Sequence, residues 1–205
     1  MSESQYALDR PFFIRQGSRG ILALHDLPGS PAQLLPLCET LAENGYTVSA
    51  PALPGPDADW ETLHLAVRQA QVRLAAECES IVLLGLGAGS WLALLLAAEY
   101  MPAGAICLAP VFPPRPFLPV FCRRSHRKTL QTLVRSAMSS LYAVSSPILL
   151  LCREAQTSHC ERILSCVSSR EHSLCTLPYD SQLRPAGADR VHLTHQVLSF
   201  LEARI

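Results

Sequence analysis

The chain has 205 residues, of which 49% are hydrophobic and 17% are charged, and its formal net charge at pH 7 is zero. This length suits one domain with a sizeable core, and this composition excludes a disordered chain. The balanced charge gives no reason to expect nucleic acid or an anionic membrane as a partner. We therefore expect a single domain over residues 1–205.

The first 16 residues are polar and interrupted by Pro11, so they lack the apolar core of a secretory signal peptide. The longest apolar runs, such as 91–98, are too short to span a bilayer. None of the eight cysteines forms a C-x-x-C pair, which argues against a zinc site and against thioredoxin-like chemistry. We expect a cytoplasmic protein with no transmembrane segment, free thiols, no cofactor and no metal.

Apolar runs of strand length alternate with amphipathic segments of helical length along the chain. The expected strands are 20–27, 46–55, 80–86, 104–110, 147–154 and 172–178. The expected helices are 31–45, 59–77, 89–100, 159–168 and 188–205, with Asp59 as the N-cap of the second. Continuously apolar strands that alternate with helices indicate a mostly parallel sheet covered on both faces. Residues 6–17 predict an additional antiparallel hairpin at one edge.

Residues 111–146 interrupt this alternation. The segment begins with a proline-rich stretch and continues as a predicted helix over 129–144. An insertion of this size between strands is typical of a lid or a binding element. It also carries a cluster of basic residues, which we interpret as a solvated face in preference to a contact with an anionic ligand or a membrane surface. The cluster consists of Arg123, Arg124, His126, Arg127 and Lys128.

Five stretches of the sequence carry a family resemblance. The stretch "ILALHDLPGSPAQLLPLCETLAENGYTVSAPALPGP" resembles the start of α/β-hydrolases of the bacterial carboxylesterase and monoacylglycerol lipase type. The stretch "LLGLGAGSWLALLLAAEY" resembles the strand, turn and helix that carry the nucleophile in that family. The stretches "AGAICLAP", "SPILLLCRE" and "SSREHSLCTLP" resemble the later strands of that family. The resemblance therefore covers nearly all of the chain and is weakest over 111–146. It implies an α/β-hydrolase fold with a small lid-like insertion.

The residue at the nucleophile position of the family departs from its pattern. The family motif G-x-S-x-G is a sharp turn between strand and helix that exposes a serine hydroxyl. Here the motif reads Gly85-Leu86-Gly87-Ala88-Gly89, so Gly87 stands at the nucleophile position without a side chain. Nucleophilic catalysis needs a hydroxyl or thiol beside a base. Ser90 is one turn into the helix and is expected to point elsewhere.

The positions that the resemblance assigns to the catalytic acid and base carry amides. Gln156 follows the strand at 147–154, where the acid is expected, and Gln182 stands before the last helix, where the base is expected. An amide carries no charge to stabilise an imidazolium and does not act as a base near neutral pH. Glu154 in a shifted register and His159 are the alternative candidates for these two roles.

The fourth departure is in the loop that holds the oxyanion in this family. The family's His-Gly pair is replaced by His25-Asp26. The N–H groups of Leu27 and Ala88 are the donors that the resemblance implies for an oxyanion. A carboxylate at Asp26 is unfavourable for acyl transfer there unless it points away. The candidate ligand pocket consists of His25, Asp26, Leu27, Gly87 and Ala88.

The glycines of the turn admit a rival interpretation as a phosphate cradle at a helix N-terminus. The dinucleotide fingerprint G-x-G-x-x-G is not matched, because its sixth position is Ser90 and the turn follows the third strand instead of the first.

Three hypotheses about the function of the chain stay open. In the first, the chain is a non-catalytic member that binds a small apolar or acyl-like ligand, or a protein partner such as an active relative. In the second, it is an active ester hydrolase with atypical catalytic residues. In the third, it is a structural subunit, and the fold alone does not separate the three.

Overall fold

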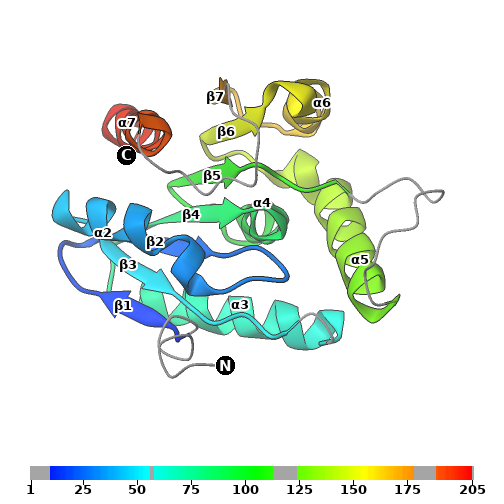
Figure 1. Cartoon of the computed structure of the whole chain (residues 1–205), viewed down its shortest axis with the longest axis horizontal. Coiled ribbons are helices and arrows are strands. Elements are labelled where there is room, and N and C mark those ends of the chain that lie inside the picture. Colours follow the sequence, from blue (N-terminus) through cyan, green and yellow to red (C-terminus); the bar gives the residue numbers. More distant parts are fainter. Residues whose placement is uncertain (1–9, 56–57, 113–123, 178–187, 205) are drawn as a thin grey trace.

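The structure, a computed structural model, describes residues 10–55, 58–112, 124–177 and 188–204. A seven-stranded sheet in the order β1-β3-β2-β4-β5-β6-β7 forms its centre (Figure 1). Neighbouring strands are parallel, except that β1 runs antiparallel to β3. The strands are β1 (Phe12–Ile14), β2 (Arg19–Leu24), β3 (Thr47–Ala50), β4 (Ser80–Leu86), β5 (Gly104–Leu108), β6 (Ile148–Arg153) and β7 (His172–Leu177). The expected mostly parallel sheet is confirmed.

Helices cover both faces of this sheet. The α-helices are α2 (Leu35–Glu43), α3 (Trp60–Ala75), α4 (Ala88–Tyr100), α5 (Arg124–Ser140), α6 (Thr157–Cys166) and α7 (Ala188–Arg204). Three short 3-10 turns are η1 (Pro31–Gln33), η2 (Leu141–Ala143) and η3 (Glu154–Gln156). Helices α2 and α7 pack on one face, and α3, α4, α5 and α6 pack on the other (Figure 1). The helices predicted from the sequence are therefore present, with small shifts at their ends.

The central strands are apolar throughout because both of their faces are covered. In β4, Leu83 packs into the core beneath α3 and α4, whereas Leu84 packs into the core beneath α2 and α7. Successive side chains of a strand point to opposite faces, so a sheet between two helical layers needs apolar residues at every position. This explains why these strands read as continuous apolar runs in the sequence.

Helix α4 is buried on all sides along residues 88–97. A helix that is apolar all round lies inside a protein and not on its surface. It packs against β4 and β5 beneath it and against α3 and α5 beside it. The turn that precedes α4 is therefore held in place by the core of the protein.

The described half of the expected lid-like insertion consists of α5 and η2. Leu133 and Ala137 of α5 are buried, as are Leu141 and Val144, and all four belong to the same core as α4. This half is a crossover helix that covers the sheet between β5 and β6. Residues 113–123 and the side chains of 124–127 lie outside the described part, so a lid over the site stays a prediction for 113–123.

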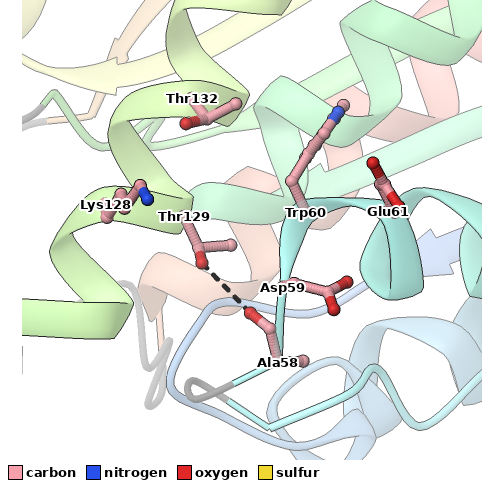
Figure 2. Close-up of a pocket in the computed structure, with 7 residues that line it drawn as sticks. All are labelled: Ala58, Asp59, Trp60, Glu61, Lys128, Thr129 and Thr132. Carbon is pink, nitrogen blue, oxygen red and sulfur yellow. Dashed lines mark hydrogen bonds between the residues drawn. The ribbon is translucent and has the colours of Figure 1, made fainter.

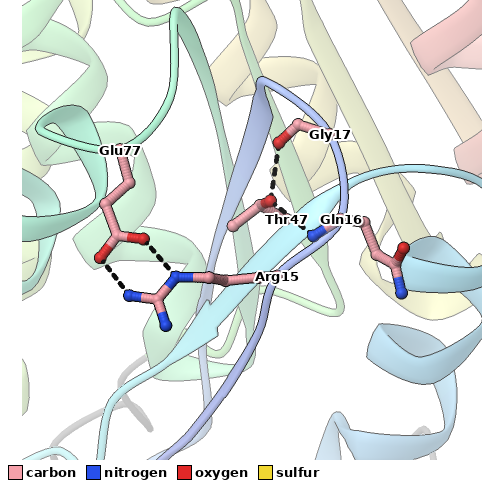
Figure 3. Close-up of polar contacts among 5 residues, drawn as sticks. All are labelled: Arg15, Gln16, Gly17, Thr47 and Glu77. Atoms are coloured by element: carbon pink, nitrogen blue, oxygen red, sulfur yellow. Dashed lines mark hydrogen bonds and ion pairs between the residues drawn. The ribbon is translucent and has the colours of Figure 1, made fainter.

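The N-terminal edge of the sheet carries an antiparallel strand, because β1 pairs with β3 and not with its neighbour in sequence, β2. Residues 6–9 of the expected hairpin lie outside the described part of the chain. The turn between β1 and β2 is anchored by side chains (Figure 3). Arg15 donates to both carboxylate oxygens of Glu77, at 2.7 and 2.9 Å, and this pairing holds the pKa of Glu77 below its usual value. The Thr47 hydroxyl donates to the Gly17 carbonyl and accepts from the Gln16 N–H. These contacts tie the edge strand to the end of α3 and to β3.

Candidate functional site

The turn between β4 and α4 has the sharp geometry that the resemblance implies. Gly87 alone separates the last residue of β4 from the first residue of α4, and its φ of 59° lies in the left-handed region. A side chain in such a conformation costs about 1–3 kcal/mol, whereas glycine adopts it freely. The Gly87 N–H donates to the Leu108 carbonyl at 2.9 Å. The turn is thereby joined to the end of β5.

The carboxylate of Asp26 occupies the space in front of this turn. Its Oδ1 accepts hydrogen bonds from the N–H of Leu27 at 2.8 Å and from the N–H of Ala88 at 2.7 Å. A Cβ added to Gly87 would overlap the carboxyl group of Asp26. The two amides that the resemblance implies as oxyanion donors do converge on one oxygen atom, but that oxygen belongs to the protein itself. The carboxylate points into the turn.

The electrostatics of the turn favour this carboxylate. Ala88 is the first residue of α4, and a helix N-terminus carries a partial positive charge from its free N–H groups. Hydrogen bonds from N–H groups to an ionised carboxylate are roughly twice as strong as neutral ones. Asp26 is only partly exposed, so water competes weakly for these donors. The protein thus supplies its own anion at the place where an anionic ligand or intermediate would bind.

His25 positions the loop that carries Asp26. Its side chain is buried, its Nε2 accepts from the Leu53 N–H at 3.0 Å, and its Nδ1 lies 2.8 Å from the Asp26 carbonyl. Both contacts are satisfied when the proton sits on Nδ1, which assigns the tautomer. The Asp26 N–H donates to the side chain of Gln33 at 3.2 Å. Backbone and side-chain contacts together hold Asp26 in its orientation.

Ser90, the nearest hydroxyl in sequence, points into the core. It is fully buried, and its Oγ lies 3.0 Å from the Gly85 carbonyl and 3.1 Å from the Leu108 carbonyl. Gly89 lies so close to the end of β2 that a Cβ there would overlap the Leu24 carbonyl. The start of α4 therefore cannot rotate to expose Ser90 without moving β2.

Gln156 lies directly after β6, at the end of η3, and its amide is bonded at both ends. Its Nε2 donates to the Pro110 carbonyl at 3.2 Å, and its Oε1 accepts from the Arg153 N–H at 3.3 Å. The side chain thus links the segment after β5 to the segment after β6. Glu154, the alternative acid, is exposed in η3. Gln182 lies outside the described residues.

A cavity of about 170 Å³ lies between α4, α5, α6 and the segment that follows β5. The ring of Phe112 meets the ring of Trp91 edge-on at 5.5 Å between centroids, and the ring of His159 at 4.6 Å. The indole of Trp91 donates to the Val111 carbonyl at 2.6 Å, which fixes this aromatic wall. The cavity is lined by Trp91, Phe112, Val134, Met138, His159, Arg162 and Ile163. His159, the candidate relocated base, is therefore part of an aromatic wall.

A larger cavity of about 460 Å³ lies between the start of α3 and α5 (Figure 2). The Thr129 hydroxyl donates to the Ala58 carbonyl at 3.0 Å and joins α5 to the segment that precedes α3. Trp60 forms part of its wall and stacks on His64 at 5.1 Å between ring centroids. Asp59, Glu61 and Lys128 give the lining charges of both signs, so it shows no preference for a cation or an anion.

Phe112, Met138 and Arg162 line this cavity although no motif in the sequence marks them as residues of a site. The cavity exists because α4, α5 and α6 meet without filling the space between them. Helical periodicity shows which face of a helix is apolar but not where three such faces leave a gap. No sequence signal marks these residues.

Within residues 10–55, 58–112, 124–177 and 188–204, no three histidine, cysteine or acidic side chains are grouped so that they could hold a metal ion. Over these same ranges, no helix combines the length and the apolar character needed to cross a membrane.

One curated protein is similar in sequence to part of this chain. No family model matches the chain. Over 110 residues the chain is 34% identical to a thermostable monoacylglycerol lipase of Bacillus sp. (strain H-257), a match that covers 49% of this chain and 44% of that enzyme. The chain thus matches less than half the length of this curated relative.

Solved structures match over a larger share of the chain. A structure from work on LipS and LipT, two metagenome-derived lipolytic enzymes, superposes with a TM-score of 0.85 at 19% identity and covers 95% of this chain and 98% of that one. The monoacylglycerol lipase of Paleococcus ferrophilus superposes with a TM-score of 0.79 at 11% identity, over the same shares of the two chains. The chain therefore has the α/β-hydrolase fold and resembles lipolytic enzymes that share it.

Proposed function

We propose that this chain is a non-catalytic protein with the α/β-hydrolase fold that binds a small apolar or acyl-like ligand. The observation that carries the proposal is the Asp26 carboxylate, which accepts hydrogen bonds from the N–H groups of Leu27 and Ala88. Acyl transfer uses two such donors to stabilise the negative charge that develops on the substrate oxygen. A carboxylate bonded to both donors withdraws them and repels that charge.

The other groups around the turn support the same conclusion. Gly87 has no side chain to act as a nucleophile, and the Ser90 hydroxyl is bonded to buried carbonyls. The amide of Gln156 serves two backbone groups and carries no charge with which to orient and stabilise an imidazolium. Loss of one catalytic group is compatible with a shifted mechanism, but the simultaneous loss of several favours the absence of hydrolysis.

The distribution of exposed apolar side chains favours a small ligand over a protein partner such as an active relative. A docking surface gathers large apolar side chains into one patch. In the described residues, the exposed large apolar side chains are spread over β1, α3, the end of α4, η2 and α7. They are Phe13, Leu65, Val72, Met101, Tyr142 and Val191.

We include a cytoplasmic location in the proposal. The seven cysteines in the described part of the chain are free thiols, and Cys38, Cys107, Cys152 and Cys160 are buried among them. Free thiols persist in a reducing compartment such as the cytoplasm. Burial raises the pKa of Cys38 to about 12, so this thiol is inert as well as shielded.

Hydrolysis assays test the proposal directly. The purified chain is incubated with p-nitrophenyl esters from acetate to decanoate and with a fluorophosphonate probe. We expect release of p-nitrophenol at the rate of the buffer control and no covalent label. Ser90→Ala and His159→Gln are the matched variants, because they remove the two nearest candidates for a nucleophile and a base. Turnover or labelling that either variant abolishes would overturn the proposal.

Restoring activity provides a second and sharper test. The resemblance alone implies that Gly87→Ser, Gln156→Asp and Gln182→His together rebuild the catalytic groups, which act as a unit. Because the Asp26 carboxylate fills the oxyanion site, we expect this triple variant to stay inactive against the same esters. Addition of Asp26→Gly is expected to produce measurable turnover. Activity of the triple variant that does not increase when Asp26→Gly is added would show that the carboxylate does not block the site.

A further inference from the structure

The sheet ends at β1 on one side and at β7 on the other, and each of these strands pairs with one other strand in the described part of the chain. We propose that β7 is an interface between two copies of this chain, in which the two β7 strands pair antiparallel about a twofold axis at Leu174. The sheet then continues from one copy into the other. The inference goes beyond the proposed function, because it concerns the association of the chain and not its ligand.

The two edge strands differ in the features that keep a sheet from pairing with another chain. Natural edge strands are protected by shortness, by proline and by charged side chains. Strand β1 has three residues, follows Pro11 directly and is followed by Arg15. Strand β7 has six residues and contains no proline, aspartate, glutamate, lysine or arginine. Of the two edges, β7 is therefore the one that can accept a further strand.

The hydrogen bonds to β6 show which backbone groups of β7 face outward. Ile148 of β6 pairs with His172 in the parallel register, and the Ile148 N–H donates to the Glu171 carbonyl at 2.9 Å. The N–H and C=O of one residue point to the same side of a strand, and this side alternates along the chain. Every second residue from Glu171 thus faces β6. The residues of β7 whose backbone groups face outward are His172, Leu174 and Thr176.

These outward groups have no backbone partner in the part of the chain that the structure describes. Helix α6 packs on one face of the sheet and α7 on the other, so the two helices flank this edge (Figure 1). A row of unpaired N–H and C=O groups is a template for pairing with another strand. The outer edge of β7 is such a row.

A second copy of β7 provides a partner for every one of these groups. In an antiparallel pair, two residues that exchange both N–H···O=C bonds lie directly opposite each other. With Leu174 opposite its own copy, His172 lies opposite Thr176 of the second copy, so all three outward residues are bonded. A shift of this register by two residues in either direction leaves His172 or Thr176 beyond the end of the opposite strand. The twofold axis is therefore placed at Leu174.

The side chains of β7 favour its own copy as the partner. A twofold interface brings the same surface together, so an excess of charge on it repels its copy, and β7 contains no acidic residue, lysine or arginine. Leu174 is half-buried on the face that α6 covers, and at the axis it meets its own copy. Most of the contact is made by main-chain groups. It therefore does not require a patch of exposed apolar side chains.

Size-exclusion chromatography of the full chain with light scattering measures this association. We expect twice the mass of the chain at high concentration and dissociation on dilution. Thr176→Pro removes an N–H that faces outward and leaves the bonds to β6 in place, a position at which an edge strand tolerates proline. It is expected to raise the dissociation constant of the dimer about tenfold or more, because each copy loses one bond. Thr176→Val is the matched control, because it keeps the N–H, and it is expected to associate like the wild type.

A disulfide trap tests the register and does not depend on the tolerance for proline. In this register Ser173 lies opposite Cys175 of the second copy, in a pair that exchanges no backbone bonds. The Cα atoms of such a pair are about 4.5 Å apart, which a disulfide can bridge. In the Cys166→Ser background, which removes an exposed native thiol, Ser173→Cys is expected to give a covalent dimer with oxidised glutathione as the electron acceptor. Addition of Cys175→Ser is expected to abolish this dimer.

The outcomes separate the interface from its register. The mass of one chain at every concentration would overturn the interface. Association that Thr176→Pro leaves unchanged, without a covalent dimer of Ser173→Cys, would show that the chain associates through another surface. A covalent dimer of the Cys166→Ser chain alone that Cys175→Ser abolishes would place Cys175 opposite its own copy and overturn the register. None of these outcomes depends on whether the chain hydrolyses esters, so the proposed function is tested separately.

Discussion

Helices α3 and α4 both begin at an aspartate oxygen, but the two aspartates reach the helices in different ways. Asp59 directly precedes α3, and its Oδ1 accepts from the Thr62 N–H at 2.7 Å. Asp26 is 62 residues away from Ala88, and its Oδ1 accepts from the N–H of that first residue of α4, also at 2.7 Å. The free N–H groups at the start of a helix require a hydrogen-bond acceptor. In α3 a residue next to the helix supplies it, and in α4 a residue distant in sequence supplies it.

The difference follows from where the two helices lie. The start of α3 is exposed, so water can satisfy any N–H group that Asp59 leaves free. The start of α4 is buried, and the residue before it, Gly87, has no side chain with which to cap the helix. A buried N–H without an acceptor is costly, so the acceptor must come from another element. In an active hydrolase that acceptor would be the substrate oxygen during the reaction, whereas here it is Asp26.

The largest expected effect comes from filling the turn. Gly87→Ser is expected to lower the free energy of unfolding by about 3 kcal/mol, because it adds backbone strain and overlaps the Asp26 carboxyl group. Urea titration measures this loss. Gly45→Ser is the matched control, because Gly45 has a φ of 86° and open space around its Cβ position. It carries the strain without the overlap and is expected to cost about 1 kcal/mol.

A double-variant cycle then isolates the contact between the two residues. In the Asp26→Gly background, the cost of Gly87→Ser is expected to fall to about that of Gly45→Ser, since only the strain is left. An equal cost of Gly87→Ser with and without Asp26 would show that the carboxylate does not stand against the turn.

The next largest expected effect is the loss of stability when either capping aspartate, Asp26 or Asp59, is replaced. Asp26→Ala is expected to lower the free energy of unfolding by about 2 kcal/mol, because two N–H groups lose a charged acceptor at a partly buried site. Asp59→Ala removes one exposed bond and is expected to cost less. Chemical denaturation of both variants at pH 7 makes the comparison. A larger loss for Asp59→Ala would contradict the ranking of tertiary over local capping.

The smallest effect is a pH dependence at the local cap. The hydrogen bond from the Thr62 N–H lowers the pKa of Asp59 from its usual value of 3.8. The contribution of Asp59 to stability is therefore fully present above pH 3.8 and is lost as the pH falls through the lower pKa of the folded state. We expect the stability difference between the wild type and Asp59→Ala to shrink below pH 3.8, as measured by urea titration at several pH values. A difference that stays constant down to pH 2 would refute this origin.

The two aspartates also show which contacts of the fold could be predicted from the sequence. The sequence predicts Asp59 as a cap because the signal is local: an aspartate stands directly before a segment of helical periodicity. For Asp26, the sequence indicated its place beside the donors of Leu27 and Ala88 but not the direction of its carboxylate. That direction depends on His25, Gln33 and the start of α4, which come together only in the folded chain.

Other differences between prediction and structure have similar causes. The sequence predicts an antiparallel element at one edge of the sheet but not its partner, which is β3 and not the next strand along the chain, β2. The sequence predicts a lid-like insertion over 111–146 but not that Leu133 and Ala137 of this segment are buried in the same core as α4. Both outcomes depend on pairing or packing between distant segments, about which local periodicity carries no information.

By itself, the sequence determined the alternation of strands and helices, the mostly parallel sheet and the glycine at the turn before α4. These properties follow from local patterns, because apolar periodicity and turn residues act over a few neighbouring positions. Tertiary structure alone decided that Asp26 fills the turn, that Ser90 points into the core and that α4, α5 and α6 leave an apolar pocket between them. These properties depend on contacts between residues far apart in the chain, and such contacts form only when the sheet and its helices pack together.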